Sequence, residues 1–164
     1  MSTAAQVVAR FARDELTLAT AESLTAGLVA ATLADVPGAS AVLQGGVVAY
    51  QNRVKAEVLG VEAALLAERG AVDPGVAEAM ARGARRVLGA DVGVATTGVA
   101  GPEPHQGKPV GTVFIALAWT DEAGVEQAEA WGLRLPGDRA AIRRGTVVAC
   151  LERLATAGER RGGS

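Results

Sequence analysis

The spacing of apolar residues changes several times along the chain, and each change predicts a new secondary-structure element. Val7, Val8 and Phe11 recur at helical spacing, whereas Leu16 to Ala21 forms a mainly apolar run of strand length. The same pattern predicts helices over residues 4–14, 25–33, 52–59, 62–69, 74–88 and 138–154. It predicts strands over residues 16–21, 43–50, 92–97, 111–119 and 125–133. Helices and strands therefore alternate until the last two strands, which follow one another directly.

Polar residues and prolines mark the ends of several of these elements. Asp73 followed by Pro74 is typical of a helix start, because the aspartate caps the helix and proline suits its first turn. Asn52 and Asp138 are the first residues of predicted helices, and we expect both to act as N-caps. Residues 121–124 have the composition of a hairpin turn, so the fourth and fifth strands should be antiparallel.

This order of elements predicts an α/β fold. Strands separated by helices favour parallel pairing, and the final hairpin adds an antiparallel strand. We therefore expect a three-layer α/β/α sandwich with a mixed, mostly parallel five-stranded sheet. Residues 1–157 should form a single domain, and residues 158–164 a flexible tail.

Composition and charge narrow the class of protein. Hydrophobic residues make up 49% of the 164 residues, and the formal net charge is only −2. Such balanced charge provides no basic surface for a phosphate backbone, so we expect no nucleic-acid partner. Arg10, Arg13 and Asp14 interrupt the N-terminal apolar stretch, which argues against a signal peptide or a membrane span. A single cysteine, Cys150, is typical of a reducing compartment, and we expect a cytoplasmic protein without a membrane partner.

Ser23 lies where a predicted buried strand ends and a predicted helix begins. Free backbone N–H groups and the positive end of the helix dipole gather at such a corner, where they stabilise an oxyanion. A serine held there has the surroundings that an acyl-transfer nucleophile requires, and Gly27 leaves room for close approach. An ordinary helix cap at Ser23 or Thr25 would explain the same residues.

Tyr50 and Lys55 form a second candidate segment. Only two of the 16 basic residues are lysines, and Tyr50 is the only tyrosine. Tyr50 ends a predicted strand, at the sheet edge where open α/β folds bind ligands. Lys55 falls in the first helical turn, where the dipole and partial burial should lower its pKa until it can accept a proton from a serine. The phenol of Tyr50 could bridge the two groups or orient a substrate. A tyrosine at the edge of the core and a solvated lysine are the alternative.

Two further segments could bind an anion. Residues 98–109 form a loop rich in glycine and proline whose N–H groups could wrap a phosphate or ribose, although its glycine spacing fits neither a P-loop nor a dinucleotide motif. His105 in this loop should be exposed, and with no second histidine we expect no metal site. Arg139 starts the last helix and could pair with a phosphate, with Arg143 and Arg144 one turn further on. A plain connecting loop and a solvated basic face would explain these segments equally well.

The order and spacing of these segments together resemble the C-terminal domain of CinA. The shared segments are Glu22-Ser23-x-Thr25-x-Gly27, Gly46-x3-Tyr50-x-Asn52-x2-Lys55, Gly70-Ala71-Val72, Gly98-x-Ala100-Gly101-Pro102, Lys108-Pro109-Val110-Gly111-Thr112 and Gly137-Asp138-Arg139. The resemblance extends from Val7 to Leu154, and stand-alone members of this family include nicotinamide mononucleotide deamidase.

The resemblance implies an activity and a site. Ser23 matches the family's catalytic serine, Lys55 the lysine that activates it, and Tyr50 the tyrosine that completes the site. The substrate-binding side would comprise Leu24, Thr25, Gly27, Asn52, Gly98, Ala100, Gly101, Thr112 and Arg139. The implied reaction is hydrolysis of the carboxamide of nicotinamide mononucleotide to nicotinic acid mononucleotide and ammonia. The resemblance implies no metal and no organic cofactor. It also implies an assembly of identical subunits, most commonly a dimer.

The chain departs from the family pattern at two positions beside Ser23. Leu24 and Ala26 stand where many relatives have cysteine and glycine, and the added methyl group of Ala26 could narrow the pocket. Longer CinA proteins also carry an N-terminal nucleotide-hydrolysing domain, to which none of the shared segments belongs. These departures leave open a second function, a non-catalytic module that binds a nucleotide or a protein partner and is linked to competence or DNA damage.

Overall fold

The computed structural model describes residues 1–157, which form a five-stranded sheet with helices on both faces. The helices are α1 (Thr3–Arg13), α2 (Leu28–Ala34), α3 (Asn52–Glu57), α4 (Ala63–Arg69), α5 (Pro74–Leu88) and α6 (Arg139–Thr156), with a 3-10 turn, η1, at Ala39–Ala41. The strands are β1 (Leu18–Glu22), β2 (Leu43–Val48), β3 (Val92–Gly98), β4 (Thr112–Thr120) and β5 (Glu126–Arg134). The predicted tail, residues 158–164, lies outside the described residues.

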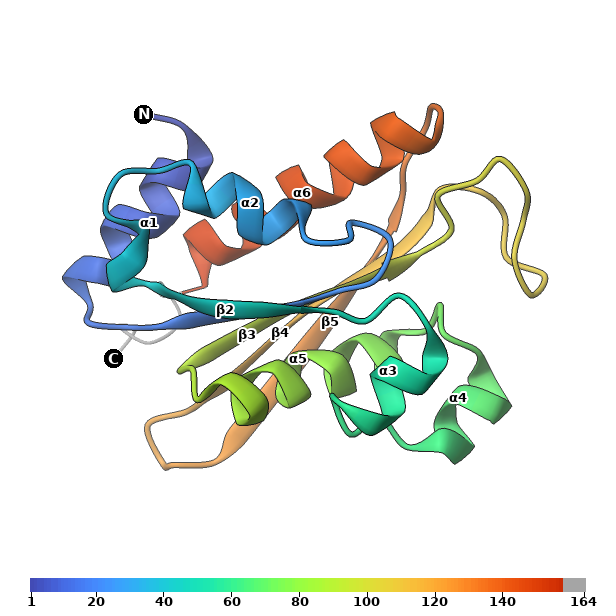
Figure 1. Ribbon diagram of the computed structural model, residues 1–164, viewed down its shortest axis with the longest axis horizontal. Coiled ribbons are helices and arrows are strands. Elements are labelled where there is room, and N and C mark those ends of the chain that lie inside the picture. Colours follow the sequence, from blue (N-terminus) through green and yellow to red (C-terminus); the bar gives the residue numbers. More distant parts are fainter. Residues whose placement is uncertain (158–164) are drawn as a thin grey trace.

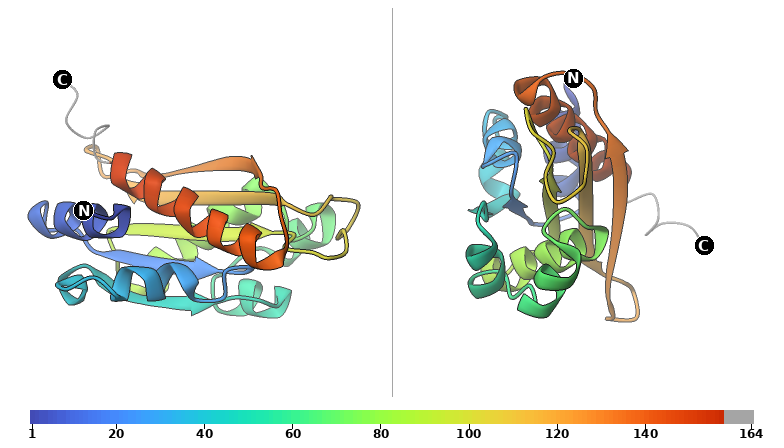
Figure 2. Two further views of the ribbon diagram at one scale, coloured as in Figure 1. Left: turned by 90° about the horizontal axis from the view of Figure 1, so that it is seen from above. Right: turned by 90° about the vertical axis from the view of Figure 1, so that its right-hand side faces the viewer.

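The sheet has the strand order β2-β1-β3-β4-β5. β1 pairs in parallel with both β2 and β3, whereas β4 is antiparallel to β3 and to β5. Four of the five strands therefore run in the same direction. Helices α1, α2 and α6 cover one face and α3, α4 and α5 the other (Figure 1), and the views in Figure 2 show the same three layers. The predicted mixed α/β/α sandwich is confirmed.

The two faces of the sheet differ in the size of their side chains. On β4, Val113, Ile115 and Leu117 belong to the core beneath α1, α2 and α6, whereas Ala116 and Ala118 belong to the core beneath α5. Small side chains on the second face leave little distance between α5 and the strands. The layer formed by α5 therefore lies close to the sheet, and this packing requires glycine at some positions.

Two glycines show how closely α5 packs. A Cβ atom on Gly83 of α5 would lie 2.2 Å from the carbonyl oxygen of Leu59, and one on Gly93 of β3 would lie 2.1 Å from that of Ala81. Neither backbone oxygen can move without shifting its whole segment, so both positions exclude any larger residue.

Several predicted boundaries are confirmed. Asp73 caps α5 by accepting a hydrogen bond from the Val76 N–H (3.2 Å), and Asp138 caps α6 by accepting one from the Ala141 N–H (2.9 Å). The hairpin between β4 and β5 is antiparallel over its full length. None of the helices described has the length and apolar character needed to cross a bilayer.

Other boundaries were predicted wrongly, and three of them lie near Ser23 and Lys55. Gln51, without a side-chain bond, is the N-cap of α3, and Asn52 is its first helical residue. The helix expected from residue 25 begins only at Leu28, because Ala26 and Gly27 adopt left-handed φ values of 48° and 98° that a helix does not allow. β2 ends at Val48, two residues before Tyr50.

The close packing of α5 leads to a test with two helical glycines. Gly83→Ala should lower the free energy of unfolding by about 2 kcal/mol, because the clash with the Leu59 carbonyl outweighs the roughly 1 kcal/mol gained in helix propensity. Gly145→Ala in α6 is the matched control, since its Cβ would meet the end of the Leu135 side chain, with the nearest methyl carbon at 3.2 Å, and not a backbone atom. This variant should be neutral or stabilising. Urea unfolding of both variants measures the difference, and equal effects would contradict the packing argument.

Candidate active site

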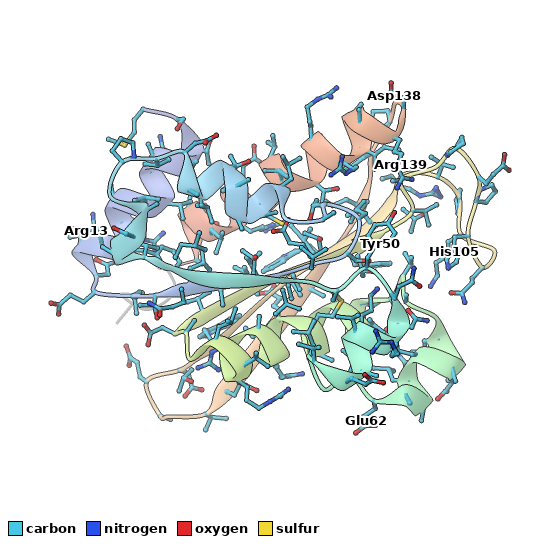
Figure 3. The ribbon with its side chains drawn as sticks, viewed as in Figure 1. Arg13, Tyr50, Glu62, His105, Asp138 and Arg139 are labelled. Carbon is cyan, nitrogen blue, oxygen red and sulfur yellow. The ribbon has the colours of Figure 1, made fainter. Side chains whose placement is uncertain are left out.

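The carboxyl ends of three neighbouring parallel strands meet at one edge of the sheet. Ser23 follows β1, Tyr50 lies two residues beyond β2, and Gly98 ends β3. At this edge the described residues enclose a cleft of about 510 Å³. Figure 3 shows Tyr50, Arg139 and His105 together at this end of the molecule. The cleft lies where open α/β sheets generally bind their ligands.

The inner end of the cleft holds a serine in contact with a buried lysine. The Nζ atom of Lys55 lies 3.1 Å from the Oγ atom of Ser23 and also donates to the carbonyl oxygen of Tyr50 at 3.1 Å. Lys55 is only 1% exposed and Ser23 is 9% exposed. One N–H of the amine donates to the Tyr50 carbonyl. The nitrogen is tetrahedral, so a second of its bonding directions points to the serine hydroxyl.

Burial changes the acidity of this lysine. Removal from water disfavours the ammonium form and lowers the pKa of Lys55 from 10.5 to about 8. The predicted direction is therefore correct, and burial, one of the two predicted causes, lowers the pKa. Near neutral pH a useful fraction of Lys55 is an uncharged amine that can accept a proton.

The phenol of Tyr50 does not bridge Ser23 and Lys55. Its oxygen accepts a hydrogen bond from Nη2 of Arg139 at 2.6 Å, and Nη1 of the same guanidinium donates to the Gly101 carbonyl at 2.7 Å. Tyr50 is half-exposed, with 49% of its surface accessible. The phenol and Arg139 thus form a polar wall of the cleft, and the link from Tyr50 to Lys55 is made by the tyrosine backbone.

A chain of hydrogen bonds fixes the backbone of Ser23. The Ser23 N–H donates to the carbonyl oxygen of Thr96 at 3.0 Å and lies 3.3 Å from its Oγ1. The hydroxyls of Thr96 and Thr25 are 2.8 Å apart, and the Thr25 hydroxyl donates to the Glu22 carboxylate at 2.6 Å. A threonine has one hydroxyl hydrogen, so Thr96 is the donor to Thr25. The chain therefore runs in one direction, from Ser23 to Glu22.

Glu22 also replaces a missing helix cap. Gly27, the N-cap of α2, has no side chain, and the carboxylate of Glu22 instead accepts the N–H groups of Val29 (2.8 Å) and Ala30 (3.1 Å). These are orphan donors of the first helical turn, where a negative group is stabilising. Glu22 is 1% exposed, so its role is to join β1, α2 and β3 around the serine.

The structure brings together most of the predicted site residues. Those that line the cleft are Ser23, Leu24, Tyr50, Asn52, Lys55, Gly98, Ala100, Gly101 and Arg139. Three others lie outside it. Thr25 is fully buried in the Glu22 network, Gly27 starts α2 in a left-handed conformation, and Thr112 bonds the Pro109 carbonyl through its hydroxyl. The side-chain contacts of Thr25 and Thr112 and the conformation of Gly27 support the framework of the site and do not form the surface of the cleft.

Some residues of the site were not identified from the sequence. Thr97 lines the cleft and donates to the Ala71 carbonyl at 2.7 Å, which joins β3 to the segment between α4 and α5. Lys108 donates to the Val72 carbonyl and so holds the glycine-rich loop against the same segment. The shared segment Gly70-Ala71-Val72 was the sequence feature that pointed to this part of the site. Its composition does not indicate that Thr97 and Lys108 bind its carbonyls.

The glycine-rich loop forms the outer rim of the cleft. His105 is exposed there, as predicted, and lines the cleft beside Glu103. In the described part of the chain, no three His, Cys, Asp or Glu side chains are grouped as a metal site would require. Cys150 lies far from solvent, and burial raises the pKa of its thiol, which makes it an inert part of the core.

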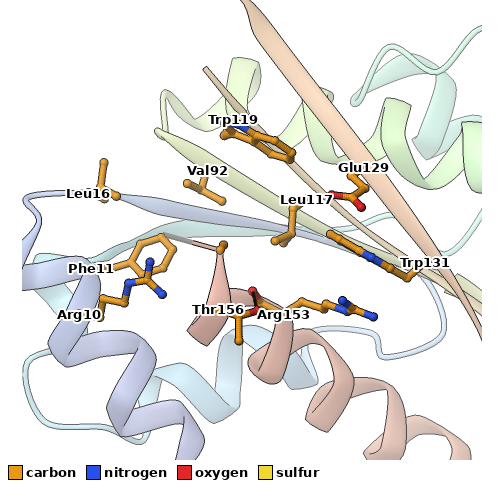
Figure 4. A pocket seen from close by; sticks show the side chains of 11 residues that line it. Arg10, Phe11, Leu16, Val92, Leu117, Trp119, Glu129, Trp131, Arg153 and Thr156 are labelled. Carbon is orange, nitrogen blue, oxygen red and sulfur yellow. Dashed lines mark hydrogen bonds between the residues drawn. The ribbon is translucent and has the colours of Figure 1, made fainter. Parts of the chain in front are cut away.

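A second cavity lies at the opposite end of the sheet (Figure 4). It is bordered by Phe11, Val92 and Trp131, with the Arg153 guanidinium 4.5 Å from the centre of the Trp131 ring. Val92 is the first residue of β3, whereas the serine lies beyond the carboxyl ends of the strands. At about 50 Å³ this cavity has room for a few water molecules only, so the large cleft is the candidate site.

Comparison with known proteins is consistent with this architecture. A CinA-like protein from Frankia casuarinae is 54% identical over 136 residues, and one from Geobacter sulfurreducens is 51% identical over 149 residues. These matches cover 83% and 90% of this chain but 30% and 35% of the relatives, so the chain spans about a third of their length.

Solved structures agree over nearly the whole chain. The competence/damage inducible protein CihA from Agrobacterium tumefaciens is 36% identical, with a TM-score of 0.81 and 94% of each chain covered. A CinA superfamily protein from Klebsiella pneumoniae is 30% identical, with a TM-score of 0.87 and 96% of each chain covered. The sequence model of the CinA C-terminal domain matches residues 1–157. The chain therefore belongs to the CinA C-terminal domain family.

Proposed function

We propose that this protein is an amidohydrolase that converts nicotinamide mononucleotide to nicotinic acid mononucleotide and ammonia. The observation that carries the proposal is the 3.1 Å contact between the buried amine of Lys55 and the hydroxyl of Ser23. A serine beside an amine that loses its proton near neutral pH is the arrangement that Ser-Lys acyl transfer requires.

In the first half of the reaction, Ser23 attacks the carboxamide. The Lys55 amine takes the hydroxyl proton as Oγ bonds to the carbonyl carbon, and the carbonyl oxygen becomes an oxyanion. Within the described residues, the N–H groups of Leu24 and Thr25 make no hydrogen bond, and we assign them as oxyanion donors. They belong to a turn and not to a helix start. The Lys55 ammonium then protonates the amide nitrogen, the C–N bond breaks and ammonia leaves.

In the second half, water releases the acid. Lys55 removes a proton from a water molecule, whose oxygen attacks the ester carbon, and the same two N–H groups hold the second oxyanion. The bond between carbon and Oγ then breaks, Lys55 returns the proton to Ser23, and nicotinic acid mononucleotide is free. Each proton that Lys55 accepts is given back, so the pair is restored after one turnover.

The polar wall of the cleft supports a substrate with a phosphate. The cleft volume of about 510 Å³ falls within the range typical of small-molecule sites. Arg139 lines the cleft, and its guanidinium stays positively charged at any pH at which the protein is folded. This guanidinium donates hydrogen bonds to the Gly101 carbonyl and the Tyr50 phenol oxygen. We assign the phosphate to Arg139 and Tyr50, which leaves the pyridine carboxamide for the Ser23 end of the cleft.

The catalytic pair leads to a direct test. Ser23→Ala and Lys55→Met should each lower the rate of ammonia release from nicotinamide mononucleotide by at least about a thousandfold, because nucleophile and base act as a unit. Ser40→Ala, which removes an exposed hydroxyl in η1, is the matched control and should keep full activity. Unchanged ammonia release from Ser23→Ala would refute the mechanism. Tight binding of the mononucleotide without turnover by the unaltered protein would favour the non-catalytic binding module.

The acidity of Lys55 leads to a pH dependence. Because its pKa is lowered to about 8, the uncharged fraction of Lys55 that can act as a base decreases progressively as the pH falls below that value. The kcat should therefore rise about tenfold per pH unit below pH 8 and level off above it. Stopped assays between pH 5.5 and 9.5 measure the profile, and a flat profile over this range would contradict the role of Lys55.

The role of Arg139 can be separated from folding effects by comparing two substrates. Arg139→Met should lower kcat/KM for nicotinamide mononucleotide about 10- to 100-fold more than for nicotinamide riboside, which lacks the phosphate. Any disturbance of Tyr50 or Gly101 affects both substrates and cancels in the ratio. Arg144→Met, an exposed arginine on the same helix, is the control. An equal loss with both substrates would show that Arg139 does not meet the phosphate.

A further inference from the structure

The turn that carries Ser23 has a demanding backbone conformation. Ala26 and Gly27 both have left-handed φ values, 48° and 98°. Glycine adopts this conformation freely, but for alanine it costs about 1 kcal/mol. Such residues persist only where neighbouring groups hold the backbone in place. The turn from Ser23 to Gly27 therefore needs anchors beyond its own hydrogen bonds.

One anchor comes from a helix that is distant in sequence. The half-buried Arg143 of α6 donates from Nε to the Leu24 carbonyl at 2.9 Å and from Nη2 to the Thr25 carbonyl at 3.2 Å. A guanidinium presents these two donors in a rigid plane, so the two carbonyls are held in a fixed relation to each other. Arg143 does not line the cleft. It acts on the peptide groups behind the nucleophile and not on a ligand.

The planarity of the peptide bond carries this effect to the other side of the turn. In a trans peptide, the C=O of one residue and the N–H of the next point in opposite directions. Arg143 binds the carbonyl of Leu24, so it also fixes the direction of the Thr25 N–H. That N–H is one of the two proposed oxyanion donors. The orientation of the Thr25 N–H thus depends on the hydrogen bond that Arg143 makes to the Leu24 carbonyl, on the opposite side of the same peptide group.

We propose that Arg143 is a positioning residue that holds the Ser23 turn in the conformation required for attack and for oxyanion binding. The proposal rests on the proposed function in one respect, that Ser23 is an acyl-transfer nucleophile. It does not depend on which amide is hydrolysed. Small displacements of a reacting group can cost about a hundredfold in rate, so an anchor behind the nucleophile has a large kinetic effect.

The same helix supplies both ends of the site. Arg139 in the first turn of α6 borders the cleft, and Arg143, four residues later, holds the nucleophile turn. Residues four apart lie on one face of a helix, so α6 fixes the wall and the nucleophile relative to each other. Arg144 is next in sequence but exposed, and it provides a matched control with the same charge on the same helix.

The experiment measures Ser23 reactivity separately from amidase activity. A fluorophosphonate probe forms an Oγ–P bond with a nucleophilic serine and loses fluoride, while the serine proton passes to Lys55. Labelling rates are measured for the unaltered protein, Arg143→Met, Arg143→Lys and Arg144→Met, with Ser23→Ala as the blank. Rates are normalised to folded protein by circular dichroism. The kcat and KM for nicotinamide mononucleotide are measured on the same samples.

We expect Arg143→Met to lower the labelling rate and kcat about 10- to 100-fold while KM changes less than about threefold. The pH midpoint of labelling should stay unchanged, because Arg143 does not contact Lys55. Arg143→Lys should have intermediate rates, because a lysine offers its donors from one nitrogen and cannot hold both carbonyls in the geometry of a guanidinium. Arg144→Met should have the rates of the unaltered protein. A merely structural role would reduce the folded fraction but leave the normalised rates unchanged.

The possible failures can be told apart. Normal labelling of folded Arg143→Met would overturn the positioning role, even if ammonia release fell. If the methionine variant does not fold, Arg143→Lys decides, and labelling equal to the unaltered protein would overturn the proposal. Labelling of the unaltered protein without ammonia release would count against the proposed substrate alone. In that case, slower labelling of Arg143→Met would still support the positioning role.

Discussion

The burial of the Lys55 amine beside the Ser23 hydroxyl is the interaction on which the rest of the site depends. A charged amine loses solvation when it is buried, and here the cost appears as a pKa lowered to about 8. The fold tolerates this because the Tyr50 carbonyl and the serine oxygen both receive the amine's hydrogen bonds. The same burial that disfavours the ammonium form thereby produces a base that functions near neutral pH.

The framework behind the serine is larger than the site itself. Glu22 joins the end of β1 to the start of α2, the two threonine hydroxyls join it to β3, and Arg143 joins the turn to α6. All of these groups are buried or half-buried, and each satisfies a backbone or hydroxyl group that would otherwise lose its hydrogen bond. The nucleophile is therefore held by elements from both ends of the chain. This arrangement explains how a turn with a left-handed alanine can be kept in one conformation.

The opposite side of the cleft is built on a different principle. The alanine face of the sheet lets α5 pack closely, and Thr97 and Lys108 then bind the carbonyls of residues 71 and 72 at the approach to that helix. Lys55 and Lys108, the two lysines, thus have different roles. One is a candidate base with a lowered pKa, and the other joins a loop to its neighbouring segment. The sequence indicated the role of Lys55, whereas the contact of Lys108 is visible only in the structure.

The sequence by itself determined the elements and the layers, because these follow from local periodicity, capping and the order of strands. It pointed to Ser23, Tyr50 and Lys55 by their positions at strand ends and helix starts, and the resemblance to the CinA C-terminal domain gave these three residues as the candidate site. Only the tertiary structure decided that Tyr50 contacts Arg139 and not Ser23, that Thr25 faces a buried glutamate, and that Arg143 reaches back 119 residues to Leu24. The contacts of Arg139 and Arg143 join residues 89 and 119 positions apart, and the short-range contact of Thr25 with Glu22 depends on the conformation of the turn between them. In each case packing geometry selects the partner, and no local pattern of residues encodes it.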